Sequence, residues 1–252
     1  MKTAVIVPLG MSPPVVTAGM DAADFKISHL IMIATRHPAV QAGRELIGIA
    51  LSVRAPKIRI YTEVLSKDDI TTPQENFEFM ETAIRLIRMA RVDYGCDRVL
   101  LNVAGGRKNA CITLAMIGQL MNVDGVYHIS NPNIGLFNEG LERLRRDIDR
   151  IHEAKTLEEK QEIYREKKEQ FDHVLFPPRS EYQIIRVPTF PVDQSSVQRL
   201  LVELRGDVKG EVINLPLSDK AILERHGILE KGKSKKHYYV TEYGQKFLDA
   251  FI

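Results

Sequence analysis

Short apolar runs alternate with longer amphipathic stretches along the first half of the chain. The runs are rich in Val, Ile and Leu, and each is followed by polar residues, Gly or Pro. They are Thr3–Pro8, Ser28–Ala34, Lys57–Glu63, Arg98–Asn102 and Gly125–Ser130. Continuous apolar runs of this length predict strands that are buried on both faces of a sheet.

The stretches between these runs predict helices. They are Pro14–Asp24, Pro38–Ser52, Pro73–Tyr94 and Arg107–Met121. In the third helix, Thr72 is a candidate cap and Pro73 takes the first helical position. Strands that alternate with helices predict a three-layer α/β fold with a parallel central sheet. Ligands of such sheets bind beyond the carboxyl ends of the strands.

The pattern changes after the fifth run. Between Glu139 and Asp172, 20 of 34 residues are charged, 11 of them acidic and 9 basic. Apolar residues recur there at helical spacing, which predicts a helical hairpin insertion at about residues 137–172 with a break near Ala154–Thr156. Two interpretations stay open: a solvated hairpin with mixed ion pairs, or a lid over the ligand end of the sheet. A last strand is predicted at Tyr182–Val187.

A proline-rich segment at residues 188–191 predicts a boundary between a first domain (1–190) and a second one (191–252). The predicted elements of the second domain are a helix Ser195–Arg205 capped by Ser195 or Ser196, a strand Val212–Leu215, a helix Ser218–His226, a basic turn with Lys231, Lys233, Lys235 and Lys236, a strand at Tyr238–Thr241 and a helix Glu242–Phe251. This order is typical of a winged helix. A DNA-reading winged helix has two helices between its first strand and its wing, and only one is predicted here.

Composition narrows the class of protein. The chain has 252 residues and a formal net charge of +2, which argues against a polybasic protein. The two cysteines, Cys96 and Cys111, are too few for a disulfide scaffold and are expected to be buried thiols. No apolar run is long enough to span a membrane, and we expect a cytoplasmic protein. His29 and His128 fall in strand runs and are expected to be core or edge residues, and no histidine pair has metal-ligand spacing.

Two loops lie where the fold would place a ligand. The first, Leu9–Pro14, contains Gly10 and Ser12 and precedes a predicted helix. The second, Asn102–Asn109, places a Gly-Gly turn before Arg107 and Lys108 at the start of another predicted helix. Glycine permits close approach of the backbone to a ligand, and a helix N-terminus suits anions. The two loops therefore predict a phosphate-binding site, although neither has the spacing of a nucleotide-triphosphate P-loop.

Taken together, the segments Val7–Thr17 and Leu101–Lys108 resemble the CARF domain of type III CRISPR ancillary proteins. The resemblance covers about residues 1–190. It implies a Rossmann-like sensor of cyclic oligoadenylate that forms a homodimer, with the ligand across the two-fold axis. The Arg-x4-His motif of the HEPN ribonucleases that often follow CARF domains is absent from the C-terminal part.

Two CARF groups carry a winged helix after the sensor: transcriptional regulators that bind DNA, and ring nucleases that cleave cyclic tetra-adenylate without metal or cofactor. The incomplete winged helix and the charged hairpin favour the ring nuclease. By resemblance, the catalytic residues are Ser12, Arg107 and Lys168, with Lys167 in reserve. The implied ligand-binding residues are Gly10, Met11, Ser12, Pro13, Gly105, Gly106, Arg107, Lys108, Asn109 and Lys167.

The implied reaction is attack of a ribose 2′-OH on its own 3′-phosphate, which needs in-line geometry and charge stabilisation. The products are linear di-adenylates that end in a 2′,3′-cyclic phosphate. Because no histidine is an obvious general base in the sequence, we expect slow turnover.

Overall fold

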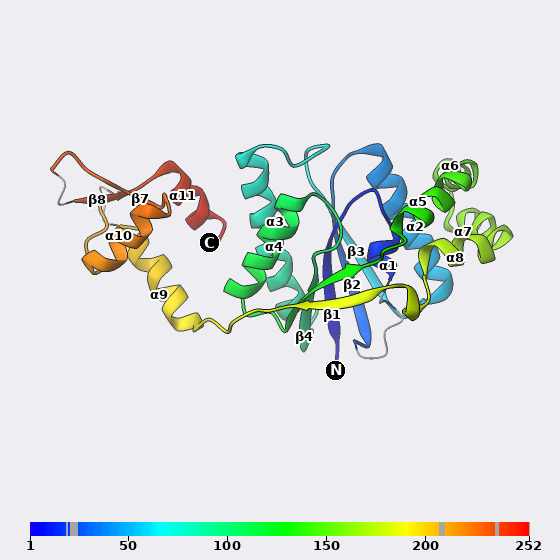
Figure 1. Ribbon diagram of the computed structural model, residues 1–252, viewed down its shortest axis with the longest axis horizontal. Coiled ribbons are helices and arrows are strands. Elements are labelled where there is room, and N and C mark those ends of the chain that lie inside the picture. Colours follow the sequence, from blue (N-terminus) through cyan, green and yellow to red (C-terminus); the bar gives the residue numbers. More distant parts are fainter. Residues whose placement is uncertain (19, 21–24, 207–209, 235–236, 252) are drawn as a thin grey trace.

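A six-stranded sheet forms the centre of the protein in a computed structural model, which describes residues 1–18, 20, 25–206, 210–234 and 237–251 (Figure 1). The strand order is β3-β2-β1-β4-β5-β6. The strands are β1 (Thr3–Leu9), β2 (Ile27–Ala34), β3 (Arg59–Val64), β4 (Arg98–Asn102), β5 (Gly125–Ser130) and β6 (Gln183–Val187). β1 to β5 are parallel, and β6 is antiparallel to β5. The predicted α/β fold with a mostly parallel sheet is confirmed.

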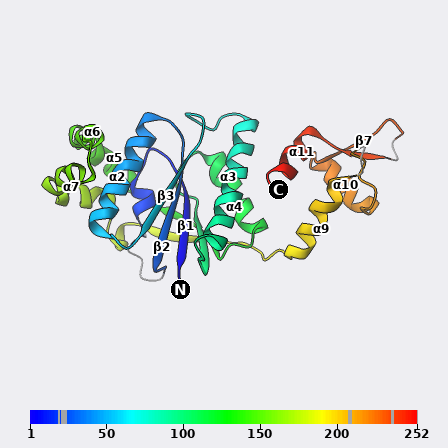
Figure 2. The same ribbon diagram turned by 180° about the vertical axis from the view of Figure 1, so that it is seen from behind.

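Helices cover both faces of the sheet (Figures 1 and 2). α3 (Pro73–Val92) and α4 (Lys108–Leu120) pack on one face. α2 (Pro38–Arg54) and the short α1 (Pro14–Thr17) pack on the other. The three predicted layers are therefore present.

Local sequence explains where α3 begins. The Thr72 hydroxyl accepts a hydrogen bond from the Glu75 backbone N–H at 3.3 Å, and the Glu75 carboxylate accepts one from the Thr72 N–H at 2.9 Å. This capping box agrees with the predicted cap.

The predicted helix Pro14–Asp24 is wrong in length. Its helical backbone ends at Thr17, and residues 19 and 21–24 lie outside the described part.

Burial follows position in the sheet. Every residue of β1 is buried, as is almost all of β2 and β4, whereas β3 and β6 at the two edges are largely exposed. The prediction that the five apolar runs are buried on both faces is therefore wrong for β3, which lies at an edge and has a neighbouring strand on one side only.

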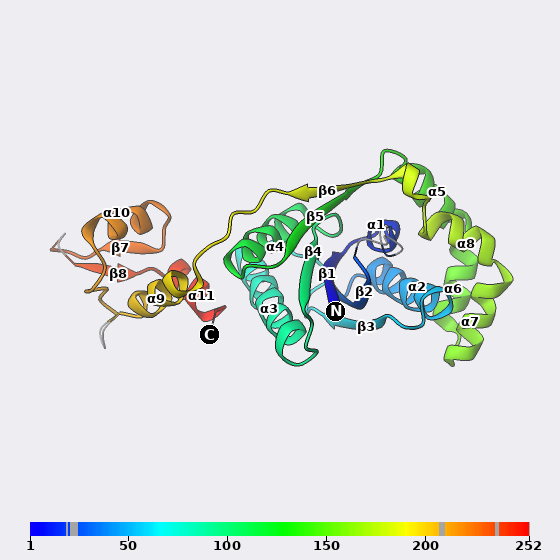
Figure 3. The same ribbon diagram turned by 90° about the horizontal axis from the view of Figure 1, so that it is seen from below.

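The charged insertion forms a hairpin of two kinked arms. The first arm is α5 (Ile134–Arg143) and α6 (Arg145–Glu153), and the second is α7 (Leu157–Glu166) and α8 (Lys168–Leu175). Its apolar side is buried against α2, and the Glu45 carboxylate of α2 is hydrogen-bonded to Lys160 and His152. Figure 3 shows the hairpin beside α2, at the opposite end of the molecule from the C-terminal unit. The hairpin thus packs against α2 of the sheet domain, away from the C-terminal unit.

The C-terminal unit contains α9 (Gln194–Leu204), α10 (Leu217–Arg225), β7 (Leu229–Lys231), β8 (Tyr238–Val240) and α11 (Glu242–Asp249). The predicted strand Val212–Leu215 is wrong, since this segment contributes only an isolated bridge at Glu211. The predicted cap of α9 is also wrong, because Asp193 accepts from the N–H groups of Ser195 and Ser196. Lys235 and Lys236 lie outside the described residues.

The C-terminal unit rests on α3. The rings of Phe77 and Tyr243 meet edge to face at 5.2 Å, and Arg88 donates to the carbonyl of Phe251 at 2.6 Å. The unit therefore packs against a helix of the sheet domain.

Candidate ligand site at the carboxyl edge of the sheet

The two glycine loops touch each other backbone to backbone. A Cβ added to Gly10 would stand 2.8 Å from the nitrogen of Gly106, and one added to Gly105 would stand 2.3 Å from the carbonyl oxygen of Pro8. Gly106 also has a φ of +79°, in the left-handed region that favours glycine. These contacts join the loops that follow β1 and β4. The sequence predicted both loops, and the structure brings them together.

The side chain of Asn102 connects the two loops through hydrogen bonds. Its side chain is buried; Nδ2 donates to the carbonyl of Val15 at 2.9 Å, and Oδ1 accepts from the N–H of Ala104 at 3.0 Å. One amide thus ties the end of β4 to the turn of α1. This explains the asparagine at the start of the second loop.

Arg107 is held by an acidic partner that the sequence did not predict. Its guanidinium makes two hydrogen bonds to the carboxylate of Asp69, one from Nε to Oδ1 at 2.7 Å and one from Nη2 to Oδ2. The hydrogen bond from Arg107 lowers the pKa of Asp69 below its ordinary value. The Arg107 side chain is 63% exposed, so the paired guanidinium still faces solvent and can meet an anion.

The other predicted ligand residues have unequal surroundings. Asn109 donates from Nδ2 to the carbonyl of Ile70 at 3.2 Å, and Lys108 is exposed at the first position of α4. Met11 is 69% exposed at the crest of the first loop. The ring of Pro13 packs on α2, 3.1 Å from the position of a Cβ on Gly43. Because α1 is a single turn, it has little helix dipole, and the groups that the first loop offers to an anion are its backbone N–H groups and Ser12.

Two hollows flank the joined loops, and Gly10, Met11 and Gly106 form the ridge between them. The β3-side hollow, of about 380 Å³, has apolar walls that include Leu9, Ile33, Val40, Leu65 and Phe79. Its polar lining residues are Thr35, His37, Asp68, Asp69 and Arg107. Size and lining suit a small-molecule site.

The β5-side hollow, of about 320 Å³, is lined by apolar residues and by several polar groups, none of which is a Lys, Arg, Asp or Glu side chain in the described part of the chain. The polar groups are Ser12, His128, Ser130, Asn131 and the backbone of Gly105 and Gly106. His128 is exposed, as its predicted place near the sheet edge allows, but neither it nor Asn131 was predicted as a site residue. Their position near the carboxyl end of a predicted strand is the sequence signal that could have identified them.

Lys167 and Lys168 line neither hollow. The Lys168 ammonium pairs with Asp172, whose carboxylate also lies 3.5 Å from Nη1 of Arg54 at the end of α2. The first loop packs on Gly43, and Arg54 follows Gly43 by eleven residues in the same helix, a distance of about 16 Å at 1.5 Å per residue. The structure therefore does not bring Lys168 to the glycine loops.

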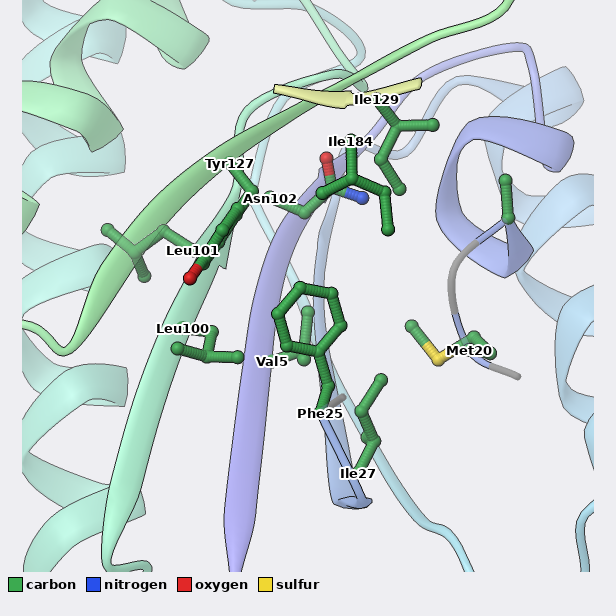
Figure 4. A pocket seen from close by; sticks show the side chains of 11 residues that line it. Val5, Met20, Phe25, Ile27, Leu100, Leu101, Asn102, Tyr127, Ile129 and Ile184 are labelled. Atoms are coloured by element: carbon green, nitrogen blue, oxygen red, sulfur yellow. The ribbon is translucent and has the colours of Figure 1, made fainter. Parts of the chain in front are cut away.

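A third, smaller hollow lies on the α2 face of the sheet (Figure 4). Phe25, Tyr127, Ile129 and Ile184 are among the apolar side chains around it, and its volume is about 30 Å³. Its polar side chain is the amide of Asn102, which is already hydrogen-bonded. This hollow has room for little more than a water molecule and offers no reactive group.

Cysteine and metal chemistry find little support at this edge. Cys111 donates from Sγ to the carbonyl of Gly105 at 2.7 Å, and burial raises its pKa to about 11, which makes it a poor nucleophile. Across the described residues, no group of three or more His, Cys, Asp or Glu side chains could hold a metal ion.

No helix in the described part of the chain is long and apolar enough to cross a membrane.

The position of the site defines the class of protein. The strand order reverses between β1 and β4, and the two joined loops lie directly beyond that switch point. A mostly parallel sheet with its ligand loops at this position is a Rossmann-like ligand-binding fold.

Residues 12–211 match the family model of CRISPR-associated protein NE0113, and the chain belongs to this family. The predicted membership of a CRISPR-associated family is confirmed. A search of curated proteins gives no match.

Two solved structures are among those that match this chain. Csm6 from Enterococcus italicus, bound to cyclic hexa-2′-fluoro-hexa-dAMP, is 10% identical with a TM-score of 0.46, over 89% of this chain and 47% of that one. Can2 from Sulfobacillus thermosulfidooxidans, in complex with cyclic tetra-adenylate, is 11% identical with a TM-score of 0.35, over 98% of this chain and 61% of that one. The chain spans less than two thirds of the length of either protein.

Proposed function

We propose that this chain is a CARF-type ring nuclease that binds cyclic tetra-adenylate and cleaves it without metal or cofactor, and so ends a type III CRISPR signal in the cytoplasm. The observation that carries the proposal is the backbone contact between the two glycine loops at the switch point, beside Arg107. Glycine backbone, a hydroxyl and an arginine are the groups that recognise a phosphodiester.

The ring would lie across the ridge between the two hollows. Arg107 and Lys108 would attract its phosphates, and Ser12 would hold the ribose and phosphate that react. A loop that fixes the 2′-OH in line with the departing 5′-oxygen supplies orientation, and donors aimed at the phosphorus oxygens stabilise the developing charge.

A homodimer fits this ligand. A ring of four nucleotides has two-fold symmetry and is too large for a single hollow of about 320 Å³. Two copies related by a two-fold axis would present two sets of Ser12 and Arg107 to the four phosphates.

The alternative is a transcriptional regulator that senses the same ring and binds DNA through the C-terminal unit. Two lysines of that unit are engaged within it: Lys220 is buried and donates to the carbonyl of Ile213 at 2.9 Å, and Lys231 lies 2.8 Å from the carboxylate of Glu224. α10 is the single helix between the Glu211 bridge and β7 in the described residues. These features give little support to a recognition helix.

The decisive experiment is incubation of the purified chain with cyclic tetra-adenylate in EDTA, with the products identified by mass spectrometry. We expect linear di-adenylates with a 2′,3′-cyclic phosphate. An unchanged ring after hours, with tight binding intact, would instead favour the regulator, and a gel shift on promoter DNA would then test it.

A further inference from the structure

Two side chains near the carboxyl end of β5 have no role in the reaction described so far. His128 lines the β5-side hollow together with Ser12. Its Nδ1 lies 3.4 Å from the carbonyl oxygen of Val103. Because a carbonyl oxygen only accepts hydrogen bonds, this contact favours the tautomer with the proton on Nδ1, which leaves Nε2 as a proton acceptor.

Asn131 brings an unused donor to the same hollow. The backbone N–H of Asn133 donates to its Oδ1 at 2.8 Å, which fixes the orientation of the amide. Its Nδ2 is buried and has no hydrogen-bond partner among the described residues. Buried donors are nearly always hydrogen-bonded in folded proteins. An orphan donor on a residue that lines a hollow points to a ligand that supplies an acceptor, and because this nitrogen has almost no accessible surface, the amide must shift slightly to reach that ligand.

The chemistry of this hollow differs from simple anion attraction. No lysine, arginine, aspartate or glutamate is among the described side chains that line it. It offers a proton acceptor, an amide donor, two hydroxyls and the backbone of the glycine turn. A positioned base and a preorganised donor are what phosphodiester cleavage by an internal hydroxyl requires.

We propose that His128 and Asn131 are catalytic residues of the ring cleavage, His128 as the general base for the 2′-OH and Asn131 as a donor to a non-bridging oxygen of the phosphate that is attacked. This inference rests on the proposed function. It also replaces the expectation that the chain lacks a histidine base.

The proposed cleavage conserves atoms and charge. The 2′-oxygen forms a bond to phosphorus while its proton passes to Nε2 of His128, and the bond between phosphorus and the 5′-oxygen breaks. A water molecule protonates the departing 5′-oxygen, and the resulting hydroxide removes the proton from the imidazolium. The ring opens to a 2′,3′-cyclic phosphate and a 5′-OH with no net change in atoms or charge at the protein.

The test of the base uses His128→Asn. Asparagine keeps a donor near Nδ1 for the Val103 carbonyl and removes the proton acceptor. We expect single-turnover cleavage to fall about 100-fold or more while ring affinity changes less than about threefold. His226→Gln, on the exposed surface of the C-terminal unit, is the matched control and should cleave normally.

Asn131→Asp tests the donor. The carboxylate still accepts from the Asn133 N–H, so the turn before α5 is kept, but the donor is lost and a negative charge faces the phosphate. We expect cleavage and affinity both to fall at least tenfold, with the cleavage rate affected more.

A second pair of measurements separates chemistry from folding. His128→Ala should regain part of its cleavage rate when free imidazole is added, which a structural role would not produce, and His128→Gln serves if the asparagine variant does not fold. Normal cleavage by a folded His128 variant would overturn the inference and leave the proposed function standing. A wild-type chain that binds the ring and never cleaves it would overturn both.

Discussion

The two hollows share a ridge of loop backbone but differ in charge. On the β3 side, Arg107 and Asp69 form an ion pair above apolar walls. On the β5 side, Ser12 shares the hollow with His128, Ser130 and Asn131, and no Lys, Arg, Asp or Glu side chain lines it among the described residues. Charged side chains attract a polyanion from solution, whereas fixed neutral donors stabilise the charge that develops as a bond breaks. Under the proposed function, the β3 side of the ridge would attract the ring and the β5 side would hold the groups that react.

The largest combined effect on stability and ring affinity is expected from Gly105→Ala, which would affect both hollows at once. A Cβ at this position would stand 2.3 Å from the Pro8 carbonyl oxygen, so the two loops must separate. We expect a loss of roughly 1–3 kcal/mol in the free energy of unfolding, as for other overpacked sites. Ring affinity should fall more than tenfold, measured by calorimetry.

Gly135→Ala is the matched control for that variant, because a Cβ there meets no atom within 4 Å and the residue lies in α5. It should be neutral or stabilising by about 0.5–1 kcal/mol. If Gly105→Ala were as stable and bound the ring as tightly as this control, the backbone contact would not matter for the site.

Ser12→Ala tests the β5 side alone. The change removes one hydroxyl and leaves the loop backbone in place. We expect the cleavage rate to fall at least tenfold, or about 1.4 kcal/mol, while affinity falls less. Ser218→Ala, in the C-terminal unit, is the control. Equal losses of rate and affinity would mean that Ser12 only holds the ring.

Arg107→Ala tests the β3 side. It removes a cation that faces solvent, so ring affinity should fall about tenfold and its dependence on log salt should flatten by about one ion. The cleavage rate of bound ring should change less. Arg145→Ala, an exposed arginine of α6 paired with Glu142, is the control. Unchanged affinity and slope would show the Gly-Gly-Arg turn to be structural.

Sequence reasoning located the sheet and the loops but not their side-chain partners. Buried strands and a Gly-Gly turn leave local patterns, so β1, β4 and the loop at Gly105–Gly106 were predictable. The partner of Arg107 was not, because Asp69 is 38 residues away and meets it only through the order of strands. Lys168 was placed by its rough position in the chain, and the packing of the hairpin on α2 leaves no periodic signal that marks which end of α2 it meets.

The Asp69–Arg107 pair predicts a small sensitivity to acid. Its hydrogen bond lowers the pKa of Asp69, so the carboxylate stabilises the fold above its ordinary pKa of about 3.9. This contribution is lost as the pH falls through the lowered value. The urea midpoint of Asp69→Asn should therefore lie slightly below that of the wild type at pH 7, and the difference should shrink at an acid pH below the ordinary aspartate pKa of about 3.9. A constant difference at both pH values would assign the effect to packing.

The smallest effect is expected from Lys168→Ala. Its ammonium pairs with Asp172 beside Arg54, about 16 Å along α2 from the place where the first loop packs. An exposed pair of this kind adds little to stability, and the hairpin is fixed to α2 by buried side chains such as Ile151 and Phe171. We therefore expect cleavage within twofold of the wild type for Lys168→Ala and for Lys167→Ala. A tenfold loss in Lys168→Ala alone, with normal affinity, would support the catalytic role that the family resemblance implies, and it would require the hairpin to move toward the ridge or to act on the ring of a second copy.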